Sequence, residues 1–406
     1  MNIAQFRNQI PKLYDILLSL YMVLREAQQE LLNLSKHYKA IAVIGPRQSG
    51  KTTLVRAVFS GKPYVSLENP DIRNFALEDP RGFLDQFPNG AILDEVQRTP
   101  ELFSYLQQVL DDSLDVAKFI LTGSNNFLLQ QNISQSLAGR VGYLNLLPFA
   151  LSEIQEIAPK TIHEKLFKGF YPPLYDKQFE IQKWFSNYIR TYIERDVRQL
   201  KNIENLVVFE RFMKLCSGRV GQLLNKSTLA IEVGVDSKTI ESWIGILEAS
   251  FILFRLVPHH HNYNKRIVKM PKLYFYDVGL ACALLGVQNA NQLELHPFKG
   301  SLFENMVIVE LIKQRLNKGK QNNLYFWRDS KGNEIDIVID NFESLIPVEI
   351  KSGKTITNDY FKGLKYWNEL TGFKGGKVIY GGEDYQKRSS GFEVIPLNLL
   401  TEKIDN

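Results

Sequence analysis

The sequence contains only two cysteines, Cys216 and Cys282, among 406 residues. Two thiols cannot build a disulfide framework or a four-thiolate zinc site. Small disulfide-stabilised extracellular proteins are therefore excluded, and a reducing compartment is the expected environment.

Long hydrophobic runs are also missing. The longest apolar stretch near the start, residues 13–24, is too short to span a bilayer and contains Asp15. No cluster of positive charge precedes it and no small-residue cleavage site follows it, so it does not have the form of a signal peptide. We therefore expect a cytoplasmic protein that makes no membrane contact.

The composition is that of an ordinary globular chain, with 44% hydrophobic and 23% charged residues. Disordered tails and fibrous repeats are excluded, and the length predicts more than one domain. The net charge of +5 is unevenly distributed. Residues 161–300 carry 19 basic and 13 acidic side chains, whereas the rest of the chain sums to −1. This local excess indicates an anionic partner or a solvated surface.

A phosphate-binding loop follows an apolar strand at residues 41–44. The pattern G-x-x-x-x-G-K-[ST] requires a strand before it and a helix after it, and both are predicted here. Backbone N–H groups of such a loop face phosphates, and the helix directs its positive end at them. We expect Lys51 to reach the β- and γ-phosphates of ATP and the Thr52 hydroxyl to bind Mg²⁺. The predicted nucleotide-binding residues are Gly45, Pro46, Arg47, Gln48, Ser49, Gly50, Lys51, Thr52 and Thr53.

Two carboxylates end the next apolar strand, at residues 91–95. Ligands lie at the carboxyl ends of strands in a parallel sheet. We expect Asp94 to hold Mg²⁺ through water and Glu95 to orient or deprotonate the attacking water.

A third strand, residues 118–122, leads to Ser124 and Asn125, one of which is expected to sense the γ-phosphate. An ordinary strand-ending turn is the alternative. Phosphoryl transfer also needs a positive group. Arg140 is the preferred candidate, with Arg47 and Arg98 as others, and a surface salt bridge is its alternative role. Such an arginine can act on the nucleotide bound to its own chain or on one bound to a neighbouring chain. Both possibilities stay open, and so does oligomer formation.

The middle of the chain predicts a helix over residues 184–200 and then a helix-turn-helix. One helix ends at Gly234, Asp236 or Ser237 caps the next, and strands at 251–257 and 273–276 form a hairpin wing that holds Lys265, Arg266 and Lys269. This layout favours duplex DNA binding. Glu241 and Glu248 on the second helix would repel DNA, so a packing module between domains is the alternative.

Four charged residues near the end form a second candidate site. Glu304 shares the apolar face of a predicted helix, which is costly for a carboxylate without a partner or metal. Asp336 and the pair Glu349 and Lys351 lie on two alternating strands, whose pairing would bring the carboxylates together. The order of an acidic helix residue, an Asp strand and a Glu-x-Lys strand resembles the PD-(D/E)xK nuclease core, and this resemblance implies metal-assisted phosphodiester hydrolysis. A solvent-facing strand of mixed charge and a fold used only for binding or assembly are the alternatives.

These features together resemble a large group of bacterial and archaeal predicted ATPases that join an AAA-type domain to a C-terminal domain of otherwise unassigned function. The resemblance implies ATP binding, a winged helix after the ATPase and a PD-(D/E)xK nuclease-like fold at the end. In that fold Glu304, Asp336 and Glu349 would bind Mg²⁺ and Lys351 would position or activate water. The matching stretches are residues 45–53, 92–98, 121–125, 136–141, 192–197, 265–280, 300–304, 327–336 and 348–351.

We therefore predict an α/β protein with four segments. They are an N-terminal helical extension at 1–35, an AAA-type P-loop domain at 36–160, a helical linker and winged helix at 161–295, and a restriction-endonuclease-like domain at 296–406. Members of the group usually begin shortly before the helix that precedes the phosphate-loop strand. Residues 22–27 look like such a beginning, so we expect translation to start at Met22. The predicted function is a Mg²⁺-dependent ATPase that couples its nucleotide state to a module acting on DNA through residues 161–300 and the C-terminal domain. The alternative is a nucleotide-dependent switch or assembly protein whose C-terminal domains make only protein contacts.

Overall fold

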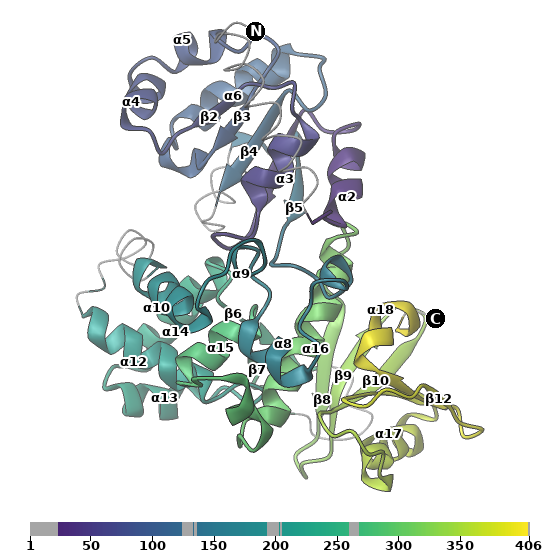
Figure 1. Ribbon diagram of the computed structural model, residues 1–406. Coiled ribbons are helices and arrows are strands. Elements are labelled where there is room, and N and C mark those ends of the chain that lie inside the picture. The colour runs from purple at the N-terminus through teal and green to yellow at the C-terminus, as the bar shows by residue number, and fades with distance from the viewer. Residues whose placement is uncertain are drawn as a thin grey trace, which may run out of the picture.

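The computed structural model describes residues 23–123, 133, 136–192, 203, 205–259 and 268–404. The expected start at Met22 lies outside these residues. The described chain forms an N-terminal domain around a parallel sheet, a mainly helical middle region and a C-terminal domain around a mixed sheet (Figure 1). Within the described residues, no helix combines the length and the apolar character needed to cross a membrane.

The N-terminal sheet has five strands, all parallel, in the order β2-β3-β4-β1-β5. Strand β1, between β4 and β5, is a continuous apolar run and is buried along its whole length, as expected where both faces of a parallel sheet are covered. The prediction of a parallel α/β sheet is confirmed. The strands are β1 (Ala40–Ile44), β2 (Tyr64–Ser66), β3 (Ile92–Asp94), β4 (Phe119–Gly123) and β5 (Val141–Asn145).

Helices cover both faces of this sheet. Ile41 and Val43 of β1 pack in one apolar cluster with α2 and α3, whereas Ala40 and Ala42 share the opposite cluster with α5 and α6. This alternation is the two-residue period of a strand. The elements are α2 (Ala27–Leu34), α3 (Lys51–Val58), α4 (Pro70–Glu78), α5 (Pro80–Asp85), η1 (Val96–Arg98) and α6 (Leu102–Asp112).

The middle region is helical apart from a two-stranded antiparallel hairpin. The predicted end at Gly234 and cap at Asp236 are confirmed, because Gly234 has φ +85° and the Asp236 carboxylate accepts hydrogen bonds from the N–H groups of Lys238 and Thr239. The elements are η2 (Ser152–Ile154), α8 (Ile162–Lys168), α9 (Pro173–Asp176), α10 (Ile181–Tyr192), α12 (Leu206–Ser217), α13 (Lys226–Val233), α14 (Ser237–Ala249), β6 (Leu253–Leu256), β7 (Lys272–Phe275), α15 (Val278–Leu284) and η4 (Ala290–Glu294).

The two largest differences from the predicted boundaries in this region concern one strand and one helix. The strand expected from residue 251 begins only at Leu253, because Phe251 adopts φ +56° and the Ile252 N–H bonds to the Leu247 carbonyl. The positive φ of Phe251 and the hydrogen bond of Ile252 both belong to the turn that ends α14. The helix expected over 184–200 begins earlier, at Ile181, and residues 193–200 lie outside the described part of the chain.

The C-terminal sheet has six strands in the order β12-β13-β11-β10-β9-β8. Strands β8, β9 and β10 are antiparallel, whereas β10, β11 and β13 are parallel. The predicted pairing of the two strands that carry Asp336 and Glu349 is confirmed. The elements are α16 (Lys299–Leu316), β8 (Leu324–Arg328), β9 (Glu334–Asp340), β10 (Leu345–Lys351), η5 (Asn358–Phe361), α17 (Lys362–Thr371), β11 (Gly376–Tyr380), β12 (Gln386–Lys387), β13 (Phe392–Pro396), η6 (Leu397–Leu399) and α18 (Leu400–Lys403).

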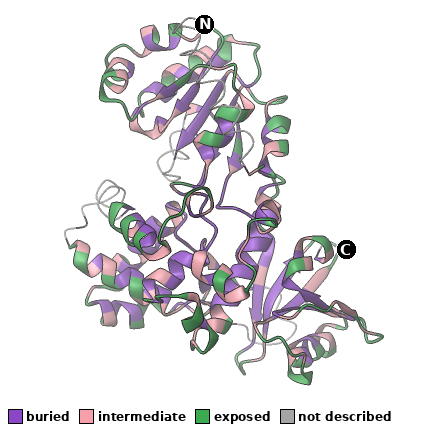
Figure 2. Cartoon of the chain, viewed as in Figure 1, coloured by how far each residue is buried: buried purple, intermediate pink, exposed green. Residues whose placement is uncertain are grey.

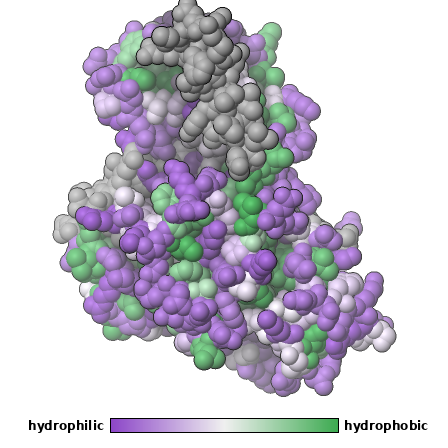
Figure 3. All heavy atoms as spheres, viewed as in Figure 1, coloured by the Kyte–Doolittle hydropathy of each residue, from purple (hydrophilic) through white to green (hydrophobic). Residues whose placement is uncertain are grey.

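Helix α16 joins the three parts of the molecule. It packs against β10, β7, α15 and α8, and most of its residues are buried (Figure 2). One continuous apolar core contains Leu147 from the N-terminal domain, Val278 from the middle region and Leu311 from α16. The face shown in Figure 3 is mostly hydrophilic outside the grey atoms, with hydrophobic residues in small separate groups. The main apolar contacts therefore lie inside the molecule and cross the domain boundaries.

Asn305 of α16 forms hydrogen bonds with the backbone of β7, and a substitution there tests how the helix is fixed to this strand. The buried Asn305 amide accepts a hydrogen bond from the Phe275 N–H at 2.7 Å and donates to the Phe275 carbonyl at 2.8 Å. Asn305→Leu should lower the free energy of unfolding by about 2–5 kcal/mol, because two buried backbone groups lose their partners at about 1–3 kcal/mol each. Chemical denaturation measures this change. The exposed Asn33→Leu is the matched control, and an equal effect of both substitutions would contradict the assignment.

Candidate functional site

The loop after β1 has the backbone of a phosphate-binding loop. A Cβ atom at Gly45 would lie 2.1 Å from the Leu146 carbonyl oxygen, so only glycine fits there. Gly50 adopts φ +91°, which glycine reaches without strain, and α3 begins at the next residue. The loop therefore points its N–H groups and the start of α3 toward one place, as anion binding requires.

Lys51 lies along this loop. It is 7% exposed, and its ammonium group donates to the carbonyls of Gly45 at 3.0 Å and Pro46 at 2.7 Å. The ammonium is thus held within the curve of the loop, where a phosphate chain cradled by the loop would meet it.

Asp94, at the end of β3, is contacted by three hydroxyl groups. It accepts hydrogen bonds from Thr52 at 3.2 Å, from Tyr64 at 2.6 Å and from Thr122. Burial and the Asp94 carboxylate raise the pKa of Tyr64, so Tyr64 stays a donor at neutral pH. A threonine hydroxyl beside a carboxylate is a hard oxygen pair, so Thr52 and Asp94 fit the predicted Mg²⁺.

Glu95 follows in the left-handed region with φ +57°, an uncommon backbone conformation for a residue with a side chain. Its carboxylate accepts a hydrogen bond from the Gln97 amide. Local strain of this kind is often retained where it directs a side chain into a functional site. Glu95 does line the same cavity as the phosphate loop.

This cavity has a volume of about 860 Å³, which lies within the usual range for small-ligand sites. One side of it is the N-terminal domain and the other side comes from α9 and α10 of the middle region. A ligand held there touches both parts at once. The lining residues are Arg47, Gln48, Gly50, Lys51, Thr52, Thr53, Glu68, Asp94, Glu95, Pro172, Pro173, Asp176, Tyr188 and Thr191.

The three candidate arginines lie in different places. Arg47 lines the cavity, and Arg98 is 3.8 Å from Glu68, which also lines it. The Arg140 carbonyl accepts from the Ala40 N–H at the amino end of β1, the opposite end from the phosphate loop. Its guanidinium donates to Asp111 at 2.8 Å. Arg140 therefore does not reach the nucleotide site of its own chain.

The predicted phosphate sensors Ser124 and Asn125 lie outside the described residues. The structure shows a polar group that the sequence reasoning missed, Thr122, whose hydroxyl at the carboxyl end of β4 contacts Asp94. Its position was predictable, because β4 lies between β1 and β3 and its end must adjoin both.

Arg25 was also missed. Its guanidinium donates to the Ser49 carbonyl of the phosphate loop at 2.7 Å, to the Leu147 carbonyl at 2.7 Å and to the Glu153 carboxylate at 3.0 Å. Arg25 is 8% exposed and the Glu153 side chain is fully buried. No local pattern marks this residue, since its partners lie 24 to 128 positions away along the chain.

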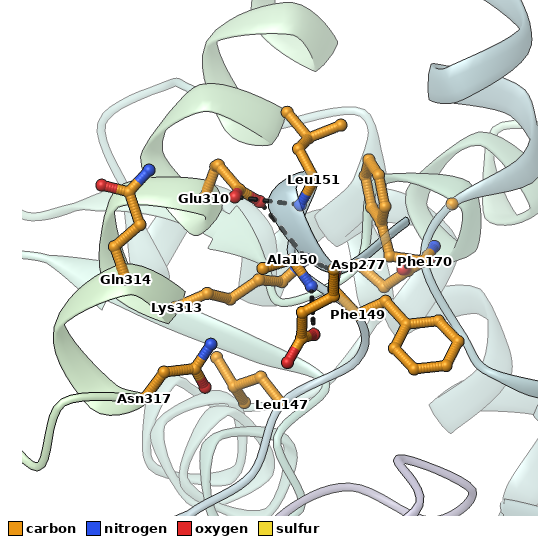
Figure 4. A network of polar contacts seen from close by, with 12 residues as sticks. Leu147, Phe149, Ala150, Leu151, Phe170, Asp277, Glu310, Lys313, Gln314 and Asn317 are labelled. Atoms are coloured by element: carbon orange, nitrogen blue, oxygen red, sulfur yellow. Dashed lines mark hydrogen bonds and ion pairs between the residues drawn. The ribbon is translucent and has the colours of Figure 1, made fainter. Parts of the chain in front are cut away.

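The segment at 147–151 is held from the other side by α16 (Figure 4). Lys313 donates to the Phe149 carbonyl at 2.7 Å, and the Glu310 carboxylate accepts from the Leu151 N–H at 3.0 Å. Burial raises the pKa of Glu310 to about 7. Polar contacts thus run from the phosphate loop through Arg25 to this segment and on to α16.

The predicted C-terminal carboxylates converge. The Lys351 ammonium lies 2.7 Å from Glu349 and 3.4 Å from Asp336. Glu304 accepts hydrogen bonds from Lys272 at 3.2 Å and from the Tyr274 hydroxyl. The sequence therefore predicted the carboxylates but missed the two residues from β7.

The pKa values of these carboxyl groups shift in different directions. Burial raises the pKa of Glu304 and, together with Asp336, that of Glu349. Burial also opposes ionisation of Asp336, but the charges of Lys351 and Lys272 outweigh it and lower the pKa of Asp336. Among the described residues, no three His, Cys, Asp or Glu side chains are grouped so that they could hold a metal.

Three domain families match consecutive parts of the chain. Residues 37–155 match an AAA domain, residues 159–291 match a domain of unknown function (DUF8612), and residues 299–400 match another (DUF4143). The first match, together with the geometry above, makes the N-terminal part an AAA-type ATPase domain with a phosphate-binding loop.

The chain is also similar to other proteins and to solved structures. The chain is 29% identical over 335 residues to uncharacterized proteins of Mycobacterium tuberculosis and Mycobacterium bovis, covering 82% of this chain and 74% of each relative. A Walker-type ATPase of Pyrococcus abyssi is similar with a TM-score of 0.44 and 15% identity, over 64% of this chain and 94% of that one. The RuvB Holliday junction branch migration motor of Thermotoga maritima is similar with a TM-score of 0.30 and 15% identity, over 56% and 88%.

Arg25→Ala should weaken nucleotide binding about tenfold, or ~1.4 kcal/mol, because the Ser49 peptide loses the contact that orders it. It should also destabilise the fold by about 3–5 kcal/mol, since Glu153 stays buried without its partner. Titration with a fluorescent ATP analogue and chemical denaturation measure the two effects.

The double variant Arg25→Met with Glu153→Gln separates these effects. It should recover much of the stability but not the affinity, because no buried charge is left alone while the Ser49 contact is still absent. The exposed Arg211→Ala is the control. Unchanged affinity in both Arg25 variants would remove Arg25 from this role.

Proposed function

We propose that this protein is a Mg²⁺-dependent ATPase that works as a nucleotide-dependent switch. The observation that carries the proposal is the cavity shared between the phosphate loop and helices α9 and α10. A nucleotide that contacts both sides favours the arrangement in which they approach each other. ATP and ADP differ by the γ-phosphate, so they stabilise that arrangement to different degrees.

The side chains have separate roles in hydrolysis. Lys51 places positive charge beside the β- and γ-phosphates, and the loop N–H groups bind their oxygens. Thr52 and Asp94 would hold Mg²⁺, which neutralises charge that develops on the phosphates during transfer. Glu95 orients the attacking water or accepts its proton. Thr122 and Tyr64 keep the Asp94 carboxylate in place through the hydrogen bonds described above.

The switch reaches the C-terminal domain through buried polar contacts. Arg25 holds the loop carbonyl of Ser49 and the segment at 147–151, and Lys313 and Glu310 hold that segment on α16. Because these groups are buried and charged, breaking any one contact is costly. A change in the loop therefore favours a joint movement of the segment and α16 over a local loss of contact.

Two substitutions separate binding from hydrolysis. Lys51→Ala should lower turnover by about 100-fold or more, because it removes the charge that faces the transferred phosphoryl group. Glu95→Gln should keep nucleotide affinity within about threefold but lower turnover by roughly 10²–10⁴, the usual contribution of a general base. Phosphate release and equilibrium binding measure these effects. The exposed Glu101→Gln is the control, and normal turnover in Glu95→Gln would exclude Glu95 as the water-positioning group.

Duplex DNA binding is a second candidate function, favoured by the order α13, turn, α14 and hairpin, which is that of a winged helix. Glu241 and Glu248, expected to repel DNA, both accept hydrogen bonds from Arg255 of β6. Their charge is therefore balanced inside the molecule. The same pairing occupies a basic residue of the hairpin, so it supplies no free cation for phosphate contacts.

DNA-dependent turnover distinguishes the two functions. A switch that makes only protein contacts should hydrolyse ATP at the same rate with and without duplex DNA, within about twofold. A DNA-binding protein should bind duplex with an affinity that falls steeply as salt rises. Stimulation of turnover by DNA at low salt, lost at high salt, would make DNA binding the better assignment.

A further inference from the structure

Lys272, the first residue of β7, is buried in the acidic cluster of the C-terminal domain. It is 2% exposed, and its ammonium lies 2.5 Å from Glu334 and 3.2 Å from Glu304. The ammonium also lies over the Phe326 ring at 5.6 Å from its centroid. A lysine this deeply buried needs paired carboxylates to stay charged. The hairpin of the middle region therefore contributes a cation and the Tyr274 hydroxyl to a site otherwise made by the C-terminal domain.

The other carboxylates of the cluster also have partners within the chain. Lys351 contacts Asp336 and Glu349, as described above, and the Ile350 N–H donates to Asp336 at 2.8 Å. Arg328 lies 2.9 Å from Glu334. Four carboxylates, those of Glu304, Glu334, Asp336 and Glu349, thus face the three cations Lys272, Arg328 and Lys351.

This arrangement does not fit a catalytic Mg²⁺ ion. Magnesium requires near-octahedral oxygen ligands at about 2.0–2.1 Å. Here the carboxylate oxygens are directed to ammonium and guanidinium groups of the same chain. A divalent ion placed among them would also be repelled by Lys272, whose ammonium contacts Glu304 and Glu334.

We infer that the C-terminal carboxylate cluster binds ammonium groups of the same chain and not a catalytic metal ion. Lys272 is held by Glu304 and Glu334, and Lys351 is held by Asp336 and Glu349. The ligand of this nuclease-like site is thus a cation from the same chain. Backbone hydrogen bonds also join the hairpin region to the C-terminal domain. The His259 N–H donates to the Phe326 carbonyl at 2.7 Å, and the Val268 N–H donates to the Arg328 carbonyl at 3.0 Å. The connection between β6 and β7 therefore pairs with β8 at both of its described ends, and Lys272 ties the hairpin to α16 and β9.

The junction between the hairpin and the C-terminal domain limits the movements that the switch can make. The hairpin and the C-terminal domain move as one unit, because separating them would break the ion pairs of Lys272 with Glu304 and Glu334 and the backbone hydrogen bonds to β8. The middle region cannot release its hairpin to a ligand while these contacts are intact.

Metal binding and cleavage test the inference on the full-length protein without nucleotide. Manganese binding is followed by electron paramagnetic resonance, and duplex DNA is incubated with Mg²⁺ or Mn²⁺. The wild-type protein should bind no Mn²⁺ that depends on Asp336 and should leave DNA intact. One equivalent of Mn²⁺ lost in Asp336→Asn, or cleavage lost in Lys351→Ala, would overturn the inference.

A double-mutant cycle tests the pairing itself by thermal unfolding. Lys272→Met should lower the melting temperature by several degrees, and adding Glu304→Gln should restore part of the loss, because it removes the carboxylate left unpaired. Lys269→Met, an exposed lysine near the same strand, is the control and should have no effect. Strictly additive losses in the double variant would show that the two residues are not coupled and would overturn the inference.

Discussion

The contact on which the rest of the structure depends is the one between Arg25 and the phosphate loop. Arg25 joins a loop carbonyl to the segment at 147–151, and its buried partner Glu153 accepts hydrogen bonds from the N–H groups of Glu26 and Ala150. A guanidinium can do this because its donors lie in a rigid plane and reach several acceptors at once. The nucleotide site is thereby fixed to the element through which the N-terminal domain meets the others.

Helix α16 extends this connection through the molecule. Lys313 and Glu310 near its carboxyl end hold the segment at 147–151, and Glu304 near its amino end accepts the ammonium of Lys272. The helix is buried and continuous over 18 residues, so it transmits displacement as a rigid body more easily than it bends. The carboxylates that resemble a nuclease site thus act as a structural junction, and the chemistry of the molecule is concentrated at the phosphate loop.

The parts of this account that the sequence predicted are those whose signal is local. The phosphate loop, Asp94 and Glu95 follow from short patterns next to apolar strands, and the meeting of Asp336 with Glu349 follows from the two-residue period of paired strands. Arg25 and Lys272 could not be found in that way, because periodicity shows which face a residue occupies but not which distant residue faces it. The position of Glu304 on the apolar face of its helix was predicted. Its partner Lys272 lies in another domain and was missed. Arg140 was chosen by its residue type alone, and the structure places it at the amino ends of the strands.

The central claim is that the nucleotide at the phosphate loop sets the position of the C-terminal domain. Both native cysteines are buried, so spin labels can be directed to Leu114→Cys and Phe342→Cys, whose native side chains are 97% and 100% exposed. Pulsed electron–electron resonance then gives the distance between the two domains in the Glu95→Gln background. The account predicts that ATP with Mg²⁺ shifts this distance distribution relative to ADP and to nucleotide-free protein. Identical distributions in all three states, with ATP binding demonstrated, would contradict it.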